Sequence, residues 1–308
     1  MHERCPICAS IRLRFVRAFG TYRLWHCDEC GVQHWTPLVH PDADYYESEA
    51  MGLYADKHRG ESGMEARFLP FLERYGRVTD KDILDVGCSD GWLLAQMAQR
   101  GNRAHGIDID TRALEVARSR GLEHVLKASA EEFVAHAHER ALRFDLVTMF
   151  DVLEHTTDPS RVLRDLASVL KPDGRLIGTV PHRRRFFADL VVSDYPPHHF
   201  FRFDIPALRS CVQHAGLLLE HAESFEWGYA GPVALAAARR RVRVALGYPA
   251  EARRPSGVGV GGGPRRRSVR SRVSGALVSW LGRSTMLPER ALGRGFKLFF
   301  VARAPQPA

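Results

Sequence analysis

Two short apolar runs each carry an acidic residue near their end, and a glycine-rich segment follows the first of them. Residues 83–86 include Asp85 and lead into Gly87-Cys-Ser-Asp-Gly91, and a second run ends at Asp108. A buried strand that enters a glycine-rich turn is where open α/β sheets bind ligands. A carboxylate about twenty residues further on is placed to accept the hydroxyls of a ribose. These residues predict a site for a nucleoside-containing cofactor.

The acidic residues of this segment discriminate between nucleoside cofactors. Asp85 and Asp90 would stand beside the pyrophosphate of a dinucleotide, and like charges at short range in a partly dry cleft repel strongly. The same carboxylates attract the ammonium and sulfonium groups of S-adenosylmethionine (SAM). We therefore expect SAM as the cofactor.

Four motifs make the chain similar to the class I SAM-dependent methyltransferases. They are Leu84-Asp-Val-Gly-Cys-Ser-Asp-Gly91, Gly106-Ile-Asp108, Phe144-Asp-Leu-Val-Thr-Met-Phe-Asp-Val-Leu-Glu-His155 and Leu170-Lys-Pro-Asp-Gly-Arg-Leu-Ile177. The resemblance implies an α/β fold with a Rossmann-like, doubly wound sheet of seven strands. That sheet is mostly parallel and has a reversed last hairpin.

The resemblance also implies which residues bind the cofactor. They are Asp85, Gly87, Gly91, Asp108, Ser129, Ala130 and Asp151. Asp85 is expected at the methionine amino group and Asp108 at the ribose, while the two glycines let the backbone approach the cofactor closely. One position departs from the family, which usually has an acid for the adenine amine where this chain has Ser129. The adenine contact then falls to Ser129 or to the backbone of Ala130.

Four of the six cysteines form two pairs with the spacing of a metal site. Two residues separate Cys5 from Cys8 and Cys27 from Cys30, and 18 residues lie between the pairs. Four thiolates at this spacing suit a tetrahedral Zn²⁺ ion, and because they leave no open position the ion would be structural. We therefore expect a small N-terminal zinc ribbon. We expect no metal at the other two cysteines or at two histidines of this region: Cys88, Cys211, His26 and His34.

Histidines occur in three segments that are expected to follow strands at the open edge of the sheet. Methyl transfer is an in-line displacement that needs the acceptor within ~3–3.5 Å of the SAM methyl carbon. A hydroxyl acceptor must usually also lose a proton, which a histidine can take. We predict His199 or His198 as this general base and His155 as the second candidate, with His182 also near the cleft. For each of them, a hydrogen bond within a loop is the structural alternative.

The motifs divide the chain into five segments. These are a zinc ribbon (1–40), a linker with an N-terminal helix (41–80), the SAM-binding core (81–227), a basic insertion (228–294) and a final strand with a tail (295–308). The helix is expected over 61–75, where apolar residues recur at helical spacing. Asp110, Asp158 and Asp204 are placed to cap later helices.

The net charge of +8 is concentrated in the insertion. Residues 239–272 hold eleven arginines and one acid, so the rest of the chain carries about −2. Nucleic acid is therefore not favoured as a partner by charge alone. Basic, partly apolar stretches within 233–290 suit peripheral contact with an anionic membrane or a cap over the substrate. A solvated insertion without a ligand is the alternative. Because no apolar run approaches ~18 residues and no leader is visible, we expect a cytoplasmic protein, with membrane association only at its surface.

We predict methyl transfer to a small-molecule hydroxyl, on a sugar, a glycan or a lipid-linked precursor. Similarity to zinc-ribbon methyltransferases of cell-surface polysaccharide pathways supports this acceptor class by analogy. One alternative is an RNA methyltransferase that docks RNA through the zinc module, although the Asn-Pro-Pro-aromatic motif for base amines is missing. The other is a binding protein with the SAM fold but no catalysis, which the departure at Ser129 leaves open.

Overall fold

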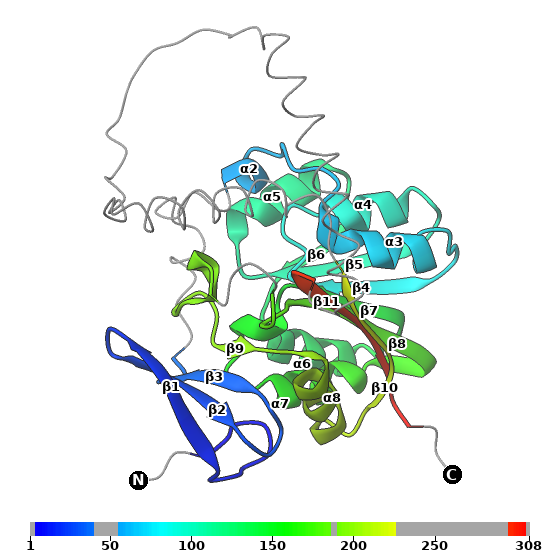
Figure 1. Cartoon of the computed structure of the whole chain (residues 1–308). Helices are drawn as coiled ribbons and strands as arrows, with labels where there is room; N and C mark the ends of the chain where they lie inside the picture. Colours follow the sequence, from blue (N-terminus) through cyan, green and yellow to red (C-terminus); the bar gives the residue numbers. More distant parts are fainter. Residues whose placement is uncertain (1–3, 40–54, 186–189, 226–294, 306–308) are drawn as a thin grey trace, which may run out of the picture.

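A sheet of seven strands forms the centre of the computed structural model, which describes residues 4–39, 55–185, 190–225 and 295–305 (Figure 1). Its order is β10-β11-β8-β7-β4-β5-β6. The strands are β4 (Asp82–Val86), β5 (Arg103–Asp108), β6 (His124–Lys127), β7 (Phe144–Phe150), β8 (Leu170–Pro181), β10 (Leu218–Phe225) and β11 (Lys297–Arg303). β4 to β8 run parallel, whereas β11 is antiparallel to β8 and β10. The predicted sheet with a reversed last hairpin is confirmed.

Helices cover both faces of this sheet, as a doubly wound fold requires. They are α2 (Ala55–His58), η2 (Ala66–Phe68), α3 (Leu69–Tyr75), α4 (Trp92–Ala98), α5 (Thr111–Ser119), α6 (Ala130–Glu139), η3 (Leu153–His155), α7 (Pro159–Ala167), η4 (Val192–Asp194) and α8 (Ile205–His214). α3, α4 and α5 lie on one side of the sheet, and α6, α7 and α8 lie on the other (Figure 1). Each set buries its apolar residues against the strands, which gives the sheet a hydrophobic core on each face.

Three aspartates begin helices, as the sequence predicts. Asp110, Asp158 and Asp204 each accept a hydrogen bond from the backbone N–H three residues further on, at 3.0–3.1 Å. These bonds satisfy donors that the first helical turn leaves unpaired, and each is worth about 1 kcal/mol.

The helix predicted over 61–75 is shorter than expected. The chain becomes helical only at Ala66, and the α-helix begins at Leu69. Pro70 has no backbone N–H and fits only the first turn of an α-helix, so it fixes where α3 can start. Met64, which the prediction placed on the buried face, is 45% exposed.

The N-terminal segment forms a second, smaller sheet. β1 (Leu13–Phe19) and β2 (Tyr22–Cys27) make a hairpin, and β3 (Gln33–Thr36) pairs with β2. The fourth strand, β9 (Phe201–Arg202), comes from the methyltransferase-like part of the chain and pairs with β3. The sequence did not predict this pairing. Residues 4–39 therefore share a sheet with the segment that carries two of the candidate histidines.

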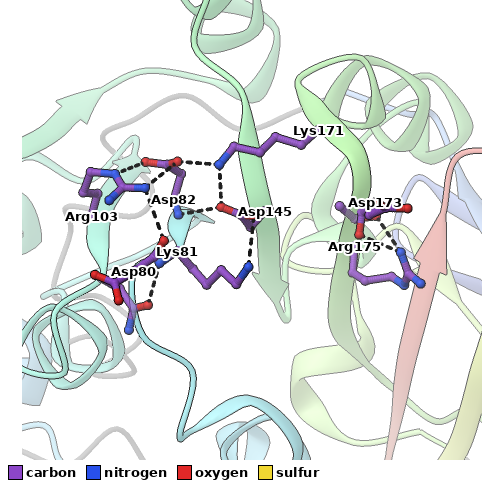
Figure 2. A network of polar contacts seen from close by, with 10 residues as sticks. Asp80, Lys81, Asp82, Arg103, Asp145, Lys171, Asp173 and Arg175 are labelled. Carbon is purple, nitrogen blue, oxygen red and sulfur yellow. Dashed lines mark hydrogen bonds and ion pairs between the residues drawn. The ribbon is translucent and has the colours of Figure 1, made fainter.

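A network of ion pairs joins the amino ends of the parallel strands (Figure 2). Lys171 at the start of β8 lies between the carboxylates of Asp82 and Asp145, 2.6 Å from each. Arg103 at the start of β5 donates to Asp82 from the other side, and the backbone N–H of Asp82 donates to Asp145 at 2.9 Å. These contacts tie β4, β5, β7 and β8 together at the edge of the sheet opposite the glycine-rich turn.

Two predictions lie outside the described residues. They concern the insertion at 228–294, with its membrane contact through 233–290, and most of the linker that precedes α2. Within the described ranges, no helix combines the length and apolar character needed to span a bilayer.

Candidate functional site

A single cavity of about 640 Å³ opens at the carboxyl ends of the parallel strands. Its wall includes Gly87 and Ser89 after β4, Asp108 at the end of β5, and Ser129 after β6. The histidines His155, His198 and His199 line the same cavity. Carboxyl ends of parallel strands are the usual position of ligands in open α/β sheets. The cavity therefore brings the predicted cofactor residues and the predicted base into one space.

The turn after β4 is held in shape by Asp108. One carboxylate oxygen accepts the backbone N–H of Ser89 at 2.7 Å, and the other accepts the N–H of Asp110 at 2.9 Å. Burial raises the pKa of Asp108, although these two N–H groups oppose the shift. Each oxygen still has a lone pair with which to accept a ligand hydroxyl.

The two glycines of the turn have different surroundings. Gly87 lines the cavity, has a φ of +72°, and a Cβ there would lie 2.5 Å from the Val152 side chain. Gly91 has a φ of +70° and is not among the residues that line the cavity. A Cβ on Gly91 would meet Leu122 and Ala117, so this glycine allows the turn to pack on α5.

Asp85 lies at the carboxyl end of β4 and is only 3% exposed. It accepts a hydrogen bond from the Thr148 hydroxyl at 2.7 Å and, among the described residues, has no ion-pair partner. Burial raises the pKa of this carboxyl to about 7, although the Thr148 bond and the nearby Arg67 guanidinium oppose the shift. The structure does not place Asp85 among the residues that line the cavity.

The start of α6 forms the wall beyond Asp108. Ser129 is the N-cap of this helix: its hydroxyl oxygen accepts the Glu132 N–H at 3.2 Å, and the Glu132 carboxylate accepts the Ser129 N–H at 2.8 Å. Ser129 and Ala130 both line the cavity.

The three candidate bases form one cluster. Their ring centroids lie 4.6–4.7 Å apart, and each can offer a ring nitrogen within 4.8 Å of the others. The Nδ1 atom of His155 lies 2.5 Å from the carbonyl oxygen of His198, to which it donates. Burial lowers the pKa of His198 to about 3 and also lowers that of His199, so both rings are neutral at pH 7. His182, by contrast, does not line the cavity, and its ring donates to the Gly295 carbonyl oxygen at 2.9 Å.

Several charged residues that line the cavity or contact its histidines were not among the predicted site residues. Glu154 is fully buried, and its Oε1 lies 3.8 Å from His199 Nε2. Asp194 lies 3.7 Å from His199 Nδ1 and accepts a bidentate hydrogen bond from Arg185. Lys297 of β11 pairs with the predicted Asp151, which also accepts the Thr179 hydroxyl at 3.0 Å. Glu154 belongs to the motif at residues 144–155, so the sequence could have indicated it. No sequence signal links Lys297 to Asp151.

The four N-terminal cysteines also meet in space. Cys5 Sγ lies 3.5 Å from Cys30 Sγ, Cys8 Sγ lies 3.5 Å from Cys27 Sγ, and all four sulfurs lie within 4.8 Å of one another. A tetrahedral Zn²⁺ with Zn–S bonds of about 2.3 Å needs sulfurs about 3.8 Å apart. The four thiols therefore fit such an ion. Cys88 and Cys211 are both buried.

Comparison with known proteins agrees with this geometry. A family model described as a methyltransferase domain matches residues 58–222, which is more than half of the chain. The ubiquinone biosynthesis O-methyltransferase of Yersinia enterocolitica is 38% identical over 114 residues, or 36% of this chain and 47% of that protein. The protein of the same name from Marinobacter nauticus is 34% identical over 163 residues, or 48% of this chain and 68% of that protein. The chain thus spans about half the length of the first of these curated relatives.

Solved structures share the fold at low sequence identity. A Haemonchus contortus phosphoethanolamine N-methyltransferase 2, solved with phosphomonomethylethanolamine and S-adenosylhomocysteine, superposes with a TM-score of 0.52 at 19% identity. The match covers 89% of this chain and 62% of that chain. The [4+2]-cyclase SpnF gives a TM-score of 0.51 at 18% identity, covering 87% and 98%. The family model spans the five parallel strands and the turns after them, and the chain therefore belongs to the class I SAM-dependent methyltransferases.

Proposed function

We propose that this protein transfers the methyl group of SAM to a hydroxyl of a small molecule. The observation that carries the proposal is the single cavity that joins the Gly87–Asp108 region to the histidine cluster. The relatives from Yersinia and Marinobacter are named O-methyltransferases, which favours oxygen as the methylated atom. A sugar, a glycan or a lipid-linked precursor remains our prediction for the acceptor.

The cofactor occupies the part of the cavity beside β4, β5 and α6. Asp108 accepts the ribose hydroxyls, the turn at Gly87 lies against the methionine part, and Ser129 or the Ala130 backbone contacts the adenine. Asp85, behind the wall, and Asp151, on it, supply negative charge for the ammonium and sulfonium groups. Bound SAM supplies the electrophilic methyl carbon. The residues of the chain hold it, orient the acceptor and receive the acceptor's proton.

The acceptor hydroxyl lies at the histidine cluster. His199 or His198 is the proposed proton acceptor, with His155 as the second candidate, because all three rings line the cavity. In the ribbon, Cys5, Cys8, Cys27 and Cys30 hold a structural Zn²⁺ ion.

Cofactor binding is tested by calorimetry with SAM. Asp108→Ala removes the ribose acceptor and the brace of the glycine-rich turn, so we expect no measurable binding. Asp173→Ala, at an exposed aspartate of β8, is the matched control and should bind like the wild type. A wild-type protein that does not bind SAM overturns the proposal.

Catalysis is tested by turnover with radiolabelled SAM and a panel of hydroxylated acceptors that includes nucleotide sugars. His199→Ala should leave SAM binding intact and lower turnover at least about tenfold. His221→Ala, at a histidine on β10 outside the cavity, should leave turnover unchanged. Salt-dependent RNA affinity without small-molecule turnover would favour the RNA alternative. SAM binding without any turnover would favour a binding protein.

A further inference from the structure

We propose that His155, His198 and His199 bind one divalent transition-metal ion in the acceptor part of the cavity, with the Glu154 carboxylate next to His199 as a further group near the ion. Ion binding itself is independent of the proposed function, whereas its role in methyl transfer rests on it. The proposed site is separate from the four-cysteine cluster, which shares no residue with it.

The first observation is the convergence of three imidazoles from two different segments. His155 comes from η3, and His198 and His199 come from the loop before β9; each offers a ring nitrogen within 4.8 Å of the others. Imidazole and carboxylate ligands lie about 2.0–2.2 Å from an ion such as Zn²⁺, so the ligand atoms of one ion are about 3–4 Å apart. The observed limit of 4.8 Å exceeds that spacing by less than 2 Å.

The second observation is that two of the rings are already oriented by their other nitrogen. His155 Nδ1 donates to the His198 carbonyl oxygen at 2.5 Å. His199 Nδ1 lies 3.7 Å from Asp194, whose carboxylate is itself fixed by Arg185. Metal-binding histidines typically donate this second N–H to a carbonyl or a carboxylate. We take Nε2 as the ligand atom of both rings, because their Nδ1 atoms face these oxygens.

The third observation is a buried carboxylate beside His199. Glu154 has 0% exposure, and neither of its carboxylate oxygens has a hydrogen-bond partner among the described residues. A buried polar group without a partner costs about 1–3 kcal/mol, and more when it is charged. Its Oε1 lies 3.8 Å from His199 Nε2, while the three ring nitrogens form the closer group. A cation held by the three rings offsets the buried charge of this carboxylate.

The ligand set indicates the kind of ion and the task. Imidazoles with one carboxylate suit Zn²⁺, Fe²⁺ or Co²⁺ rather than Mg²⁺ or Ca²⁺, which prefer oxygen ligands. Because the cluster lines the cavity, an acceptor hydroxyl can reach the ion as a further ligand. The ion lowers the pKa of that hydroxyl. Its O–H bond then breaks, the proton passes to water, the oxygen forms a bond to the methyl carbon, and the carbon–sulfur bond of SAM breaks. With the ion bound, the imidazoles act through it, so this step replaces direct proton transfer to His199 or His198.

The test uses the full chain with its cysteine site already loaded with Zn²⁺, titrated with Co²⁺. We expect one cobalt per chain, with visible d–d bands and without the near-ultraviolet band that thiolate ligands give. His199→Asn and Glu154→Gln should each weaken this cobalt binding at least about tenfold. His138→Ala, at an exposed histidine at the end of α6, should bind as the wild type does.

Two results would overturn the metal proposal. One is a wild-type chain whose bound cobalt gives only a spectrum with a thiolate band. This result comes from the wild type alone, so it does not depend on whether the variants fold. The other is equal cobalt affinity in the wild type, His199→Asn and Glu154→Gln, with retained SAM binding as evidence that the variants are folded. A chain that binds cobalt as expected but never binds SAM would refute the proposed function and leave the ion site standing.

Discussion

Strand β4 carries two aspartates, Asp82 and Asp85, whose surroundings are opposite in character. Asp82, at the amino end, accepts hydrogen bonds from Arg103 and Lys171. Asp85, at the carboxyl end, accepts a hydrogen bond from the Thr148 hydroxyl and, among the described residues, otherwise interacts only with more distant charges. The pKa of Asp82 falls to about 2, mainly through Arg103, while burial raises the pKa of Asp85 to about 7. The same residue type therefore contributes stability at one edge of the sheet and costs stability at the other.

The amino edge supplies the partners for its own charges. Asp82, Asp145 and Lys171 are each between about a fifth and a third exposed, so water lowers both the cost and the gain of these pairs. The network of Figure 2 joins strands and does not require a ligand. We therefore assign the charges at the amino edge to the stability of the sheet.

At the carboxyl edge, three carboxylates have no lysine or arginine partner among the described residues: those of Asp85, Asp108 and Glu154. Burial, together with the charge of Asp151, raises the pKa of Glu154 well above its usual value, and burial also raises the pKa of Asp108. Buried carboxylates with few partners destabilise an unliganded protein, and they gain energy when a cationic ligand arrives. Both edges carry charged residues, but only the carboxyl edge has buried carboxylates without cationic partners among the described residues. This difference, and not the presence of charge, indicates which edge binds a ligand.

The largest effect is expected from Asp85→Asn, which removes the costly charge. SAM affinity should fall at least about tenfold, because the ammonium group loses a buried counter-charge. At pH 8 the free energy of unfolding of the ligand-free protein should rise by about 1–3 kcal/mol. Calorimetry with SAM and chemical denaturation measure the two quantities.

The sign of the pH dependence of Asp85 gives a second check on the same variant. The folded pKa is about 7 against about 4 in the unfolded chain, so between these values only the unfolded chain releases the proton. The free energy of unfolding of the wild type should therefore fall as the pH rises from about 4 to 7. Asp85→Asn should not show this fall. Asp82→Asn is the control and should lower stability with little change in SAM affinity. If both variants lowered stability at pH 8, the contrast between the two edges would be wrong.

A smaller effect on turnover is expected from Trp35→Phe, which removes a hydrogen bond between the ribbon and the loop at the carboxyl edge. The Trp35 indole N–H donates to the Asp194 carbonyl oxygen at 3.1 Å, and Asp194 in turn lies beside His199. Trp35→Phe leaves that carbonyl without its donor, so turnover should fall by up to about tenfold with SAM affinity unchanged. Trp25→Phe is a matched control, because the Trp25 indole donates to Thr36 within the ribbon. Equal turnover in the two variants would show that the ribbon does not position the histidine loop.

Local patterns explain why much of the fold was predictable. Glycines and aspartates mark the turn after β4 and the helix starts, since these positions depend on backbone angles and caps that neighbouring residues determine. The four cysteines were also predictable, because a metal site requires fixed spacing. The exception was α3. The apolar spacing led us to start the helix at residue 61, whereas Pro70 restricts the start of the α-helix to Leu69.

Contacts between distant segments explain what the sequence did not reveal. The pairing of β3 with β9 joins Gln33 to Arg202, and no periodicity in either segment indicates the other. Lys297 pairs with Asp151 across a comparable separation. Each histidine was identified singly from its place after a strand, but their meeting at Glu154 depends on how the loop before β9 folds back onto η3.

The smallest effect is expected at the amino edge, with Lys171→Met. Losing the bridge between Asp82 and Asp145 should lower the free energy of unfolding by at most about 1 kcal/mol at pH 7. The depressed pKa of Asp82 means that its contribution is present above pH 4 and is lost as the pH falls towards 2. Because Arg103 remains in the variant, acid denaturation should still show part of this loss. Lys81→Met, whose ammonium lies 3.4 Å from Asp145, should cost less. A large drop in SAM affinity in either variant would mean that the two edges of the sheet are coupled, whereas unchanged affinity assigns the amino edge to stability alone.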